Sequence, residues 1–248
     1  MQLVPEGLLL SVRLILAPCM VACGEYIICL QEGYPMQRPH HLACVLFDFD
    51  GVCADTERYG LELDREVYEQ FGIEPTEEEM RTLVGTTGIE SIPALFARHG
   101  MKVTAEEFFA HRRENITIYR DMPLEAEPGL KDLLDRLRRQ GVRTGLVSTT
   151  DALPIIYALD RLAIMGRFDI VVTGDMVERH KPLPDPYLEA LARLGVEASC
   201  AIAIEDSPTG IRSAKDAGLY VLGYQGGSIP QDVSGADEAI QSFCGLAL

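Results

Sequence analysis

CVLFDFDGV, residues 44–52, gives the clearest indication of how this chain folds. Its first four residues are an unbroken apolar run, as expected for a short strand that is buried on both faces of a parallel sheet. Asp48 and Asp50 follow immediately, and Gly51 permits the backbone to turn at that point. The segment therefore predicts a central strand that ends in two carboxylates.

The residues after position 121 alternate between short apolar runs and helical periods. The apolar runs predict strands at 144–147, 168–172, 201–204 and 219–222. The periodic segments predict helices at 130–140, 152–162, 186–194 and 211–217. Strands separated by helices of this length favour a parallel sheet with right-handed crossovers. The expected fold class is α/β, with a parallel Rossmann-like sheet flanked by helices.

The segment that follows the first strand, residues 56–121, has an almost purely helical pattern. Thr76 and Glu79 have the spacing of a capping box, which marks the start of a helix. Further helices are expected at 89–99 and 105–119. An all-helical segment inserted after the first strand indicates a cap domain.

These patterns divide the chain into a catalytic core, a helical cap and an N-terminal extension. The expected bounds are 43–58 and 122–248 for the core, 59–121 for the cap and 1–42 for the extension. The extension is apolar between residues 7 and 30, but Arg13 and Glu25 interrupt it. A spanning helix needs about 20 nearly uncharged residues, and a signal peptide carries positive charge before its apolar stretch. We therefore expect no membrane association and a dispensable extension.

The charge and the cysteine content exclude several classes of protein. The 38 acidic and 22 basic side chains give a formal charge of −16, which opposes binding to nucleic acid. The same balance admits a small phosphorylated metabolite, because a bound Mg²⁺ inverts the local charge. The seven cysteines include no C-x-x-C pair, so we expect reduced thiols and a cytoplasmic protein. Nothing in the sequence indicates an oligomeric state.

Polar residues follow three of the predicted strands. They are Asp48 and Asp50 after the first strand, Ser148 and Thr149 after the second, and Glu205 and Asp206 after a later one. Ligands of open α/β sheets bind outside the carboxyl ends of the strands. We therefore expect these six residues to meet at one rim of the sheet.

The spacing of Asp48 and Asp50 suits a division of labour in phosphoryl transfer. One aspartate can attack phosphorus as a nucleophile, while the other protonates the leaving oxygen and later deprotonates water. A turn or a helix cap explains the same spacing without catalysis. The buried strand directly before the pair favours the catalytic interpretation, with Asp48 as the nucleophile.

Glu205 and Asp206 are adjacent acids at the end of a predicted strand. They would repel each other unless a cation lay between them. Ser207 and Pro208 are explained as the N-cap and the first residue of a helix, which leaves the two acids in need of a partner. Together with Asp48 they form a suitable all-oxygen site for Mg²⁺.

Residues 148–151, Ser-Thr-Thr-Asp, have the pattern of a phosphate seat, in which hydroxyls stand between a strand and the N-terminus of a helix. An ordinary N-cap explains this pattern equally well. Lys181, one of four lysines, precedes a helix at the same rim, where its charge would screen Asp48 from the phosphate. Weaker candidates for substrate contacts, in a loop of the cap, are Arg81, Thr86 and Thr87.

Four segments in this order resemble the four motifs of the haloacid dehalogenase-like hydrolase superfamily. They are DFDGV at residues 48–52, Ser148, Lys181, and Glu205 with Asp206. Asp55-Thr56-Glu57 is typical of the branch with a helical cap, which includes proteins similar to β-phosphoglucomutase and phosphoglycolate phosphatase. The resemblance extends from about residue 44 to residue 243.

The resemblance implies a Mg²⁺-dependent phosphatase that forms an aspartyl-phosphate intermediate with small phosphorylated metabolites. It implies that Asp48 is the nucleophile and Asp50 the general acid/base. It implies phosphate contacts from Ser148, Lys181 and the Thr149 amide. The Mg²⁺ ligands that it implies are Asp48, the Asp50 carbonyl, Asp206 and Glu205.

Three positions depart from the family pattern and bear on the substrate. Gly60 stands where capped relatives often carry histidine, and His180 replaces the usual glycine before the lysine. The loop at residues 85–88 lacks the arginine that is typical of the sugar-phosphate mutases. The absent arginine and Gly60 favour a phosphatase over the alternative, a mutase similar to β-phosphoglucomutase. A third hypothesis is a phosphate-binding protein without catalytic activity, and the acids at the strand ends count against it.

Overall fold

The computed structural model of the chain describes residues 37–84, 88–112 and 116–248. All of them fall within one compact unit, Pro35–Leu248. The predictions for the extension up to residue 36, and those for Thr86 and Thr87, lie outside the described residues.

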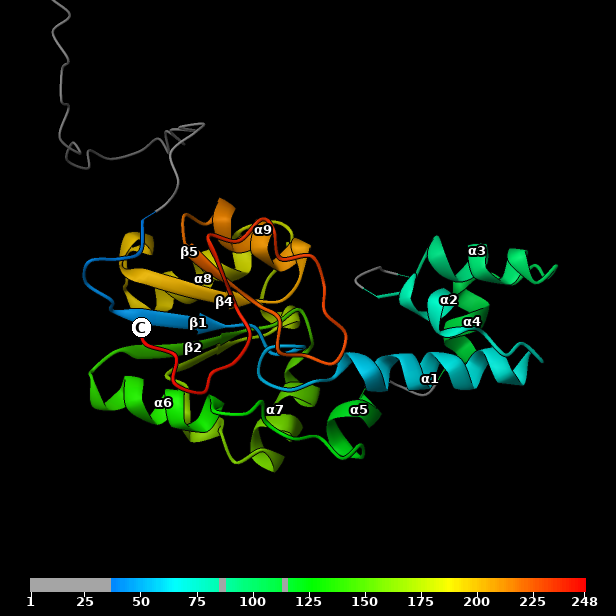
Figure 1. The fold of residues 1–248 in the computed structure, drawn as a ribbon, viewed down its shortest axis with the longest axis horizontal. Helices are drawn as coiled ribbons and strands as arrows, with labels where there is room; N and C mark the ends of the chain where they lie inside the picture. The colour runs from blue at the N-terminus through cyan, green and yellow to red at the C-terminus, as the bar shows by residue number, and fades with distance from the viewer. Residues whose placement is uncertain (1–36, 85–87, 113–115) are drawn as a thin grey trace, which may run out of the picture. The chain divides into compact units, whose positions relative to one another are not determined.

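The described residues form a six-stranded parallel sheet with the order β3-β2-β1-β4-β5-β6 (Figure 1). The strands are β1 (Cys44–Phe47), β2 (Arg143–Val147), β3 (Ile170–Val172), β4 (Ala201–Glu205), β5 (Tyr220–Tyr224) and β6 (Glu238–Ile240). The predicted parallel sheet is confirmed. The short edge strand β6 was not predicted, because only Ile240 of its three residues is buried and no apolar run marks it.

Alternate residues of β1 pack on opposite faces of the sheet. Four helices cover the sheet: α6 (Leu130–Arg139), α7 (Ala152–Arg161), α8 (Asp185–Leu194) and α9 (Pro208–Asp216). Val45 and Phe47 belong to an apolar cluster that includes α6 and α7, while Cys44 and Leu46 belong to a second cluster that includes α8 and α9. Figure 1 accordingly shows α6 and α7 on the side of the strands opposite α9. Short 3₁₀ helices lie at Met165–Arg167, Gly174–Met176 and Ala198–Cys200.

The helical insertion has an apolar cluster of its own. Its helices are α1 (Glu57–Gln70), α2 (Glu77–Arg81), α3 (Ser91–Arg98) and α4 (Ala105–His111). Tyr68 lies at the centre of the cluster, with ring centroids 4.8 Å from Phe96 and 5.0 Å from Phe108. Helix α1 contributes to two clusters, since Tyr59 and Leu63 pack with the residues of the sheet.

Two helices of the insertion begin at capping boxes. Thr76 and Glu79 form the predicted capping box at the start of α2, and Thr104 and Glu107 form another at the start of α4. In each box the threonine hydroxyl accepts from the backbone of the glutamate, and the glutamate accepts from the backbone of the threonine.

The prediction of one helix over residues 105–119 is wrong. Helix α4 ends at His111, and Arg112 has an extended backbone with φ −76° and ψ 136°. Its guanidinium pairs with Asp64 and donates to the Gly60 carbonyl oxygen at 3.1 Å. These contacts with α1 accompany the break in the helix. A separate helix, α5 (Ile116–Arg120), packs against α7.

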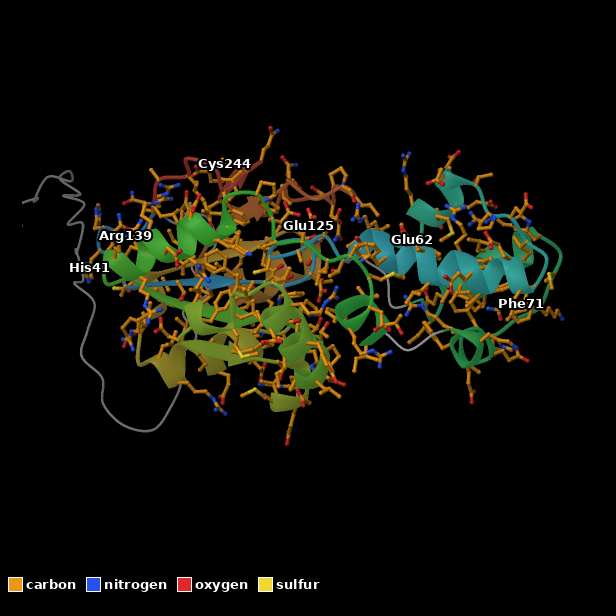
Figure 2. All side chains as sticks on the ribbon, turned by 90° about the horizontal axis from the view of Figure 1, so that it is seen from below. His41, Glu62, Phe71, Glu125, Arg139 and Cys244 are labelled. Carbon is orange, nitrogen blue, oxygen red and sulfur yellow. The ribbon has the colours of Figure 1, made fainter. Side chains whose placement is uncertain are left out.

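Two expectations from the sequence concern the cysteines and membrane association. Cys44, Cys53, Cys200 and Cys244, which are the cysteines in this part of the chain, carry free thiols. No helix among the described residues combines the length and the apolarity that crossing a bilayer requires. Charged residues such as Glu62 on α1 and Arg139 on α6 are exposed (Figure 2).

Candidate active site

Strand register brings the first and fourth motif residues together. Phe47, the last residue of β1, is paired with Ile204 of β4, so Asp48 and Glu205 are the next residues of neighbouring parallel strands. Asp48 is anchored by its backbone N–H, which donates to the Ile204 carbonyl oxygen at 3.0 Å. Asp206 follows directly. Carboxylate oxygens of Asp48, Glu205 and Asp206 lie within 4.8 Å of one another, and all three residues are buried.

Lys181 lies between two of these acids. Its Nζ donates to Asp48 Oδ1 at 2.5 Å, to Glu205 Oε1 at 2.6 Å and to the Val147 carbonyl oxygen at 2.9 Å. Burial alone would lower the pKa of Lys181, but the two carboxylates outweigh it and raise the pKa above its usual value. The ammonium group is therefore a permanent positive charge beside Asp48.

Lys181 does not offset the crowding of the three acids. Burial raises the pKa of Asp48, an effect that exceeds the lowering by Lys181 and is reinforced by Glu205. Burial, together with Asp48 and Glu205, raises the pKa of Asp206 to about 9. Glu205 Oε2 is buried and has no hydrogen-bond partner among the described residues. Three crowded carboxylates with an unsatisfied buried oxygen are suited to bind a hard cation.

Two glycines leave room for these acids. A Cβ atom at Gly51 would lie 2.1 Å from Asp206 Oδ2, and one at Gly210 would lie 2.0 Å from Glu205 Oε2. Gly51 also has φ +78°, a left-handed conformation that side chains disfavour. The acids therefore occupy space that any other residue at these positions would fill.

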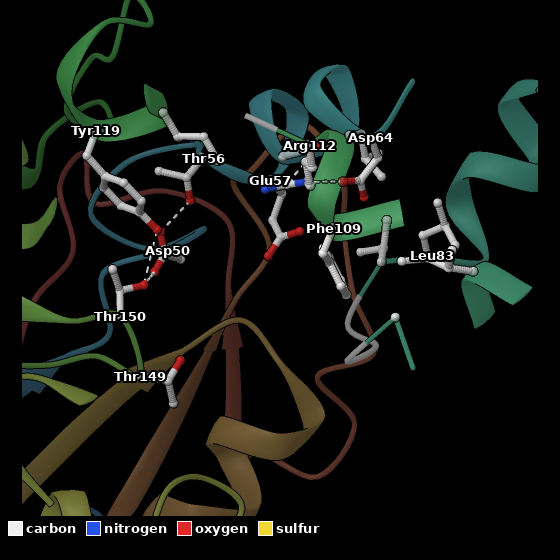
Figure 3. A pocket seen from close by; sticks show the side chains of 16 residues that line it. Asp50, Thr56, Glu57, Asp64, Leu83, Phe109, Arg112, Tyr119, Thr149 and Thr150 are labelled. Carbon is white, nitrogen blue, oxygen red and sulfur yellow. Dashed lines mark hydrogen bonds and ion pairs between the residues drawn. The ribbon is translucent and has the colours of Figure 1, made fainter. Parts of the chain in front are cut away.

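Asp50 lies outside the acidic cluster and faces a different set of partners (Figure 3). Its Oδ1 accepts from Thr56 Oγ1 and from the Tyr119 hydroxyl, each at 2.7 Å. Its Oδ2 accepts from Thr150 Oγ1 at 2.9 Å. Burial, and then the charge of Asp50, raise the pKa of Tyr119 well above its usual value, so the phenol retains its proton and remains a donor. The Asp50 carboxylate is thus held by three hydroxyls.

The residues after β2 adopt the predicted strand-to-helix arrangement. Ser148 is buried, and its Oγ accepts from the Thr150 N–H at 3.0 Å. Thr149 is exposed and lines a pocket together with Asp50. Asp151 is the N-cap residue of α7, but its side chain makes no capping hydrogen bond. The Ala152 N–H at the start of α7 instead donates to Asp175 Oδ1 at 3.0 Å, so a side chain from outside this segment caps the helix.

Comparison with known proteins adds to this geometry. Residues 45–224 match the family model described as "Haloacid dehalogenase-like hydrolase". The chain belongs to this family.

Individual relatives of this chain carry phosphatase and mutase names. The chain is 32% identical over 179 residues to "Phosphorylated carbohydrates phosphatase" of Thermotoga maritima, and the match covers 72% of this chain and 82% of that protein. It is 30% identical over 214 residues to "Beta-phosphoglucomutase" of Bacillus subtilis, covering 84% and 92%. The crystal structure of CbbY from Rhodobacter sphaeroides in complex with phosphate superposes with a TM-score of 0.65 at 33% identity, covering 82% and 95%.

The pocket beside Asp50 is the candidate substrate site of the hydrolase. It has a volume of about 400 Å³ and is lined by residues of the sheet rim and of the helical insertion. Its charged lining comprises Asp50, Glu57, Asp64 and Arg112 (Figure 3). Burial, and then Asp50, raise the pKa of Glu57 to about 7. The pocket is therefore polar and, around Asp50 and Glu57, acidic.

Arg81, the described candidate from the cap, does not line this pocket. It is exposed at the end of α2 and lines a different pocket with Met80, Thr209 and Gln231. Sequence reasoning singled out neither Tyr119 nor Arg112. Both lie in a segment that was predicted as one helix, where a tyrosine or an arginine gives no signal for a role at the site.

Proposed function

We propose that the protein is a Mg²⁺-dependent phosphatase of small phosphorylated metabolites. Asp48 attacks the phosphorus of the ester, and the alcohol oxygen leaves with the proton that Asp50 donates. Water, deprotonated by Asp50, then hydrolyses the aspartyl-phosphate. The observation that carries this proposal is the second acid, because the Asp50 carboxylate is held at the pocket wall two residues after the buried Asp48.

The other motif residues supply charge and contacts for the phosphoryl group. Lys181, already hydrogen-bonded to Asp48, reduces the repulsion between that carboxylate and the incoming phosphate oxygens. Ser148 and Thr149 at the end of β2 are the proposed phosphate contacts. Asp48, Glu205, Asp206 and the Asp50 carbonyl would hold Mg²⁺, whose chemistry is to neutralise charge on the phosphoryl oxygens.

The pocket supports a small substrate with a polar, uncharged leaving group. A volume of about 400 Å³ is at the lower end of small-molecule sites. Asp50 and Glu57 suit hydroxyls better than a second phosphate group, and Arg112 is already paired with Asp64. We propose that residues 59–121 act as the cap that selects this leaving group. The phosphatase name of the Thermotoga relative supports phosphorylated carbohydrates as a class.

Release of inorganic phosphate tests this function against the mutase alternative, which the β-phosphoglucomutase relative supports. Purified protein with Mg²⁺ should release phosphate from at least one monophosphate in a panel of sugar, glycerol, glycolate and nucleotide phosphates. No bisphosphate activator should be required, since water is the acceptor. Isomerisation of a hexose phosphate that depends on a bisphosphate, with little phosphate release, would establish the mutase instead.

Thermal unfolding with and without Mg²⁺ tests the metal site. In the metal-free folded protein Asp206 has a pKa of about 9, against an ordinary value of 3.8. As the pH rises, the unfolded chain therefore loses this proton at a lower pH than the folded protein does. Stability should therefore fall as the pH rises from about 4 to about 9. Since Mg²⁺ binds deprotonated acids, its stabilisation should grow over the same window.

At a Mg²⁺ concentration of 100 times Kd, the expected stabilisation is about 2.7 kcal/mol, or roughly 5–10 °C in the melting temperature at pH 8. The increase should be smaller at pH 5 and absent in Asp206→Asn. If Mg²⁺ raised the melting temperature equally at pH 5 and pH 8, and equally in Asp206→Asn and in the wild type, Asp206 would not be a ligand of the metal.

A further inference from the structure

The Tyr119 hydroxyl reaches the proposed acid/base from outside the four motifs. It donates to Asp50 Oδ1 at 2.7 Å (Figure 3). We propose that Tyr119 is a positioning residue that orients the Asp50 carboxylate for proton transfer to the leaving group. This inference rests on the proposed function, because it assigns Tyr119 a part in the acid/base step of that reaction.

Three donors constrain the carboxylate of Asp50. Thr56 Oγ1 and the Tyr119 hydroxyl both donate to Oδ1, at 2.7 Å each, while Thr150 Oγ1 donates to Oδ2 at 2.9 Å. Rotation of the carboxylate would break at least two of these hydrogen bonds. Oδ1 is therefore the anchored oxygen, and Oδ2, with a single donor, is the oxygen available to the leaving group.

The Thr150 hydroxyl, which donates to Oδ2 of Asp50, has Tyr119 as a second partner. The Tyr119 hydroxyl and Thr150 Oγ1 lie 3.1 Å apart, within hydrogen-bond distance, and either can be the donor. When Oδ2 carries the proton for the leaving group, the Thr150 hydroxyl can turn and donate to Tyr119. Tyr119 then still donates to Oδ1. This exchange keeps Asp50 oriented while Oδ2 gains or loses a proton.

Tyr119 is itself fixed to the catalytic core. Its carbonyl oxygen accepts from Arg161 Nη1 of α7 at 2.8 Å, and the same guanidinium donates to the Met122 carbonyl oxygen at 2.7 Å. The Tyr119 ring lies 6.0 Å from that of Phe49, which separates the two motif aspartates. Arg161 therefore fixes the backbone of Tyr119 and Phe49 packs beside its ring, and both contacts favour the orientation in which the phenol reaches Asp50.

The dependence of the rate on the leaving group distinguishes positioning of an acid from general support of the fold. A p-nitrophenolate ion leaves readily without a proton, whereas the anion of unsubstituted phenol is a poorer leaving group and gains more from an acid. The parameter kcat/KM includes steps only up to departure of the alcohol. It therefore reports this acid even when hydrolysis of the aspartyl-phosphate limits kcat.

The test compares wild type and Tyr119→Phe on p-nitrophenyl phosphate and phenyl phosphate, with Mg²⁺ present. We expect kcat/KM to fall by about tenfold for phenyl phosphate and by no more than about twofold for p-nitrophenyl phosphate. Thr150→Val, which removes the donor to Oδ2, should change the ratio of the two values in the same direction. An unchanged ratio in Tyr119→Phe, whether both values fall or neither does, would overturn the inference.

Tyr59→Phe is the matched control. Tyr59 is 3% exposed and Tyr119 5%, and both belong to the same apolar cluster. The Tyr59 hydroxyl donates to the Pro123 carbonyl oxygen at 2.9 Å and accepts from Arg58, and it makes no hydrogen bond with Asp50. Its loss should leave the ratio unchanged. If wild type hydrolyses neither aryl phosphate nor any metabolite phosphate, the proposed function fails; if it hydrolyses them and the ratio is insensitive to Tyr119, only this inference fails.

Discussion

Asp48→Asn should reduce phosphatase activity on the order of 10⁴-fold or more, because the amide cannot form the aspartyl-phosphate. Asparagine keeps the shape of the side chain in a site where Asp48 is buried. Steady-state release of phosphate from the best substrate, measured with Mg²⁺, gives the ratio of kcat values. Asp160→Asn on the exposed end of α7 makes the same chemical change away from the site and should keep full activity.

The Asp48→Asn variant should not lose stability. Since burial raises the pKa of Asp48, its charged form is unfavourable in the metal-free folded protein. Lys181 retains Glu205 as a partner after the change. We expect a melting temperature without Mg²⁺ that equals or exceeds that of the wild type. Substantial activity in a well-folded Asp48→Asn protein would exclude Asp48 as the nucleophile.

Lys181→Met should lower both stability and activity. Removal of the ammonium group leaves Asp48 and Glu205 buried without their cation, a change that costs about 3–5 kcal/mol in the free energy of unfolding. Loss of a preorganised charge beside the reacting phosphate should lower kcat/KM by roughly 10²–10³-fold. Denaturant unfolding and phosphate release measure the two effects.

The pH dependence separates this electrostatic cause from a packing defect. Burial raises the pKa of Asp48, and the variant lacks the Lys181 charge that lowers it, so Asp48 takes up a proton more readily as the pH falls. The loss of stability should therefore shrink as the pH is lowered. Lys102→Met removes an exposed lysine in the helical insertion and should change neither quantity. A destabilisation of Lys181→Met that is the same at low and neutral pH would point to packing.

Much of the sheet could be predicted from the sequence because buried parallel strands carry their own signal. Cys44–Phe47 is apolar at every position, and β1 lies within the sheet between β2 and β4. Likewise, Ser207 caps α9 and Pro208 begins it, as expected of their side-chain chemistry. Strand β6 lacks such a signal, since Glu238 and Ala239 are exposed.

Much of the candidate site was predictable because it is built from strand ends. Parallel strands place their carboxyl ends at one rim, so the meeting of Asp48 with Glu205 follows from the strand pattern. The contact of Tyr119 with Asp50 spans 69 residues, and it depends on where α5 packs against α7. No periodicity encodes that packing. The pairing of Arg112 with Asp64 likewise depends on a break in the helical segment that the pattern did not predict.

Helix α1 belongs to two separate packing clusters. Its first half packs with the sheet through Tyr59 and Leu63, and its second half packs with the cluster around Tyr68. A substitution near Tyr68 should therefore disturb the packing of the insertion, and one near Tyr59 the packing against the sheet. The two ends of one helix can in this way tolerate different changes.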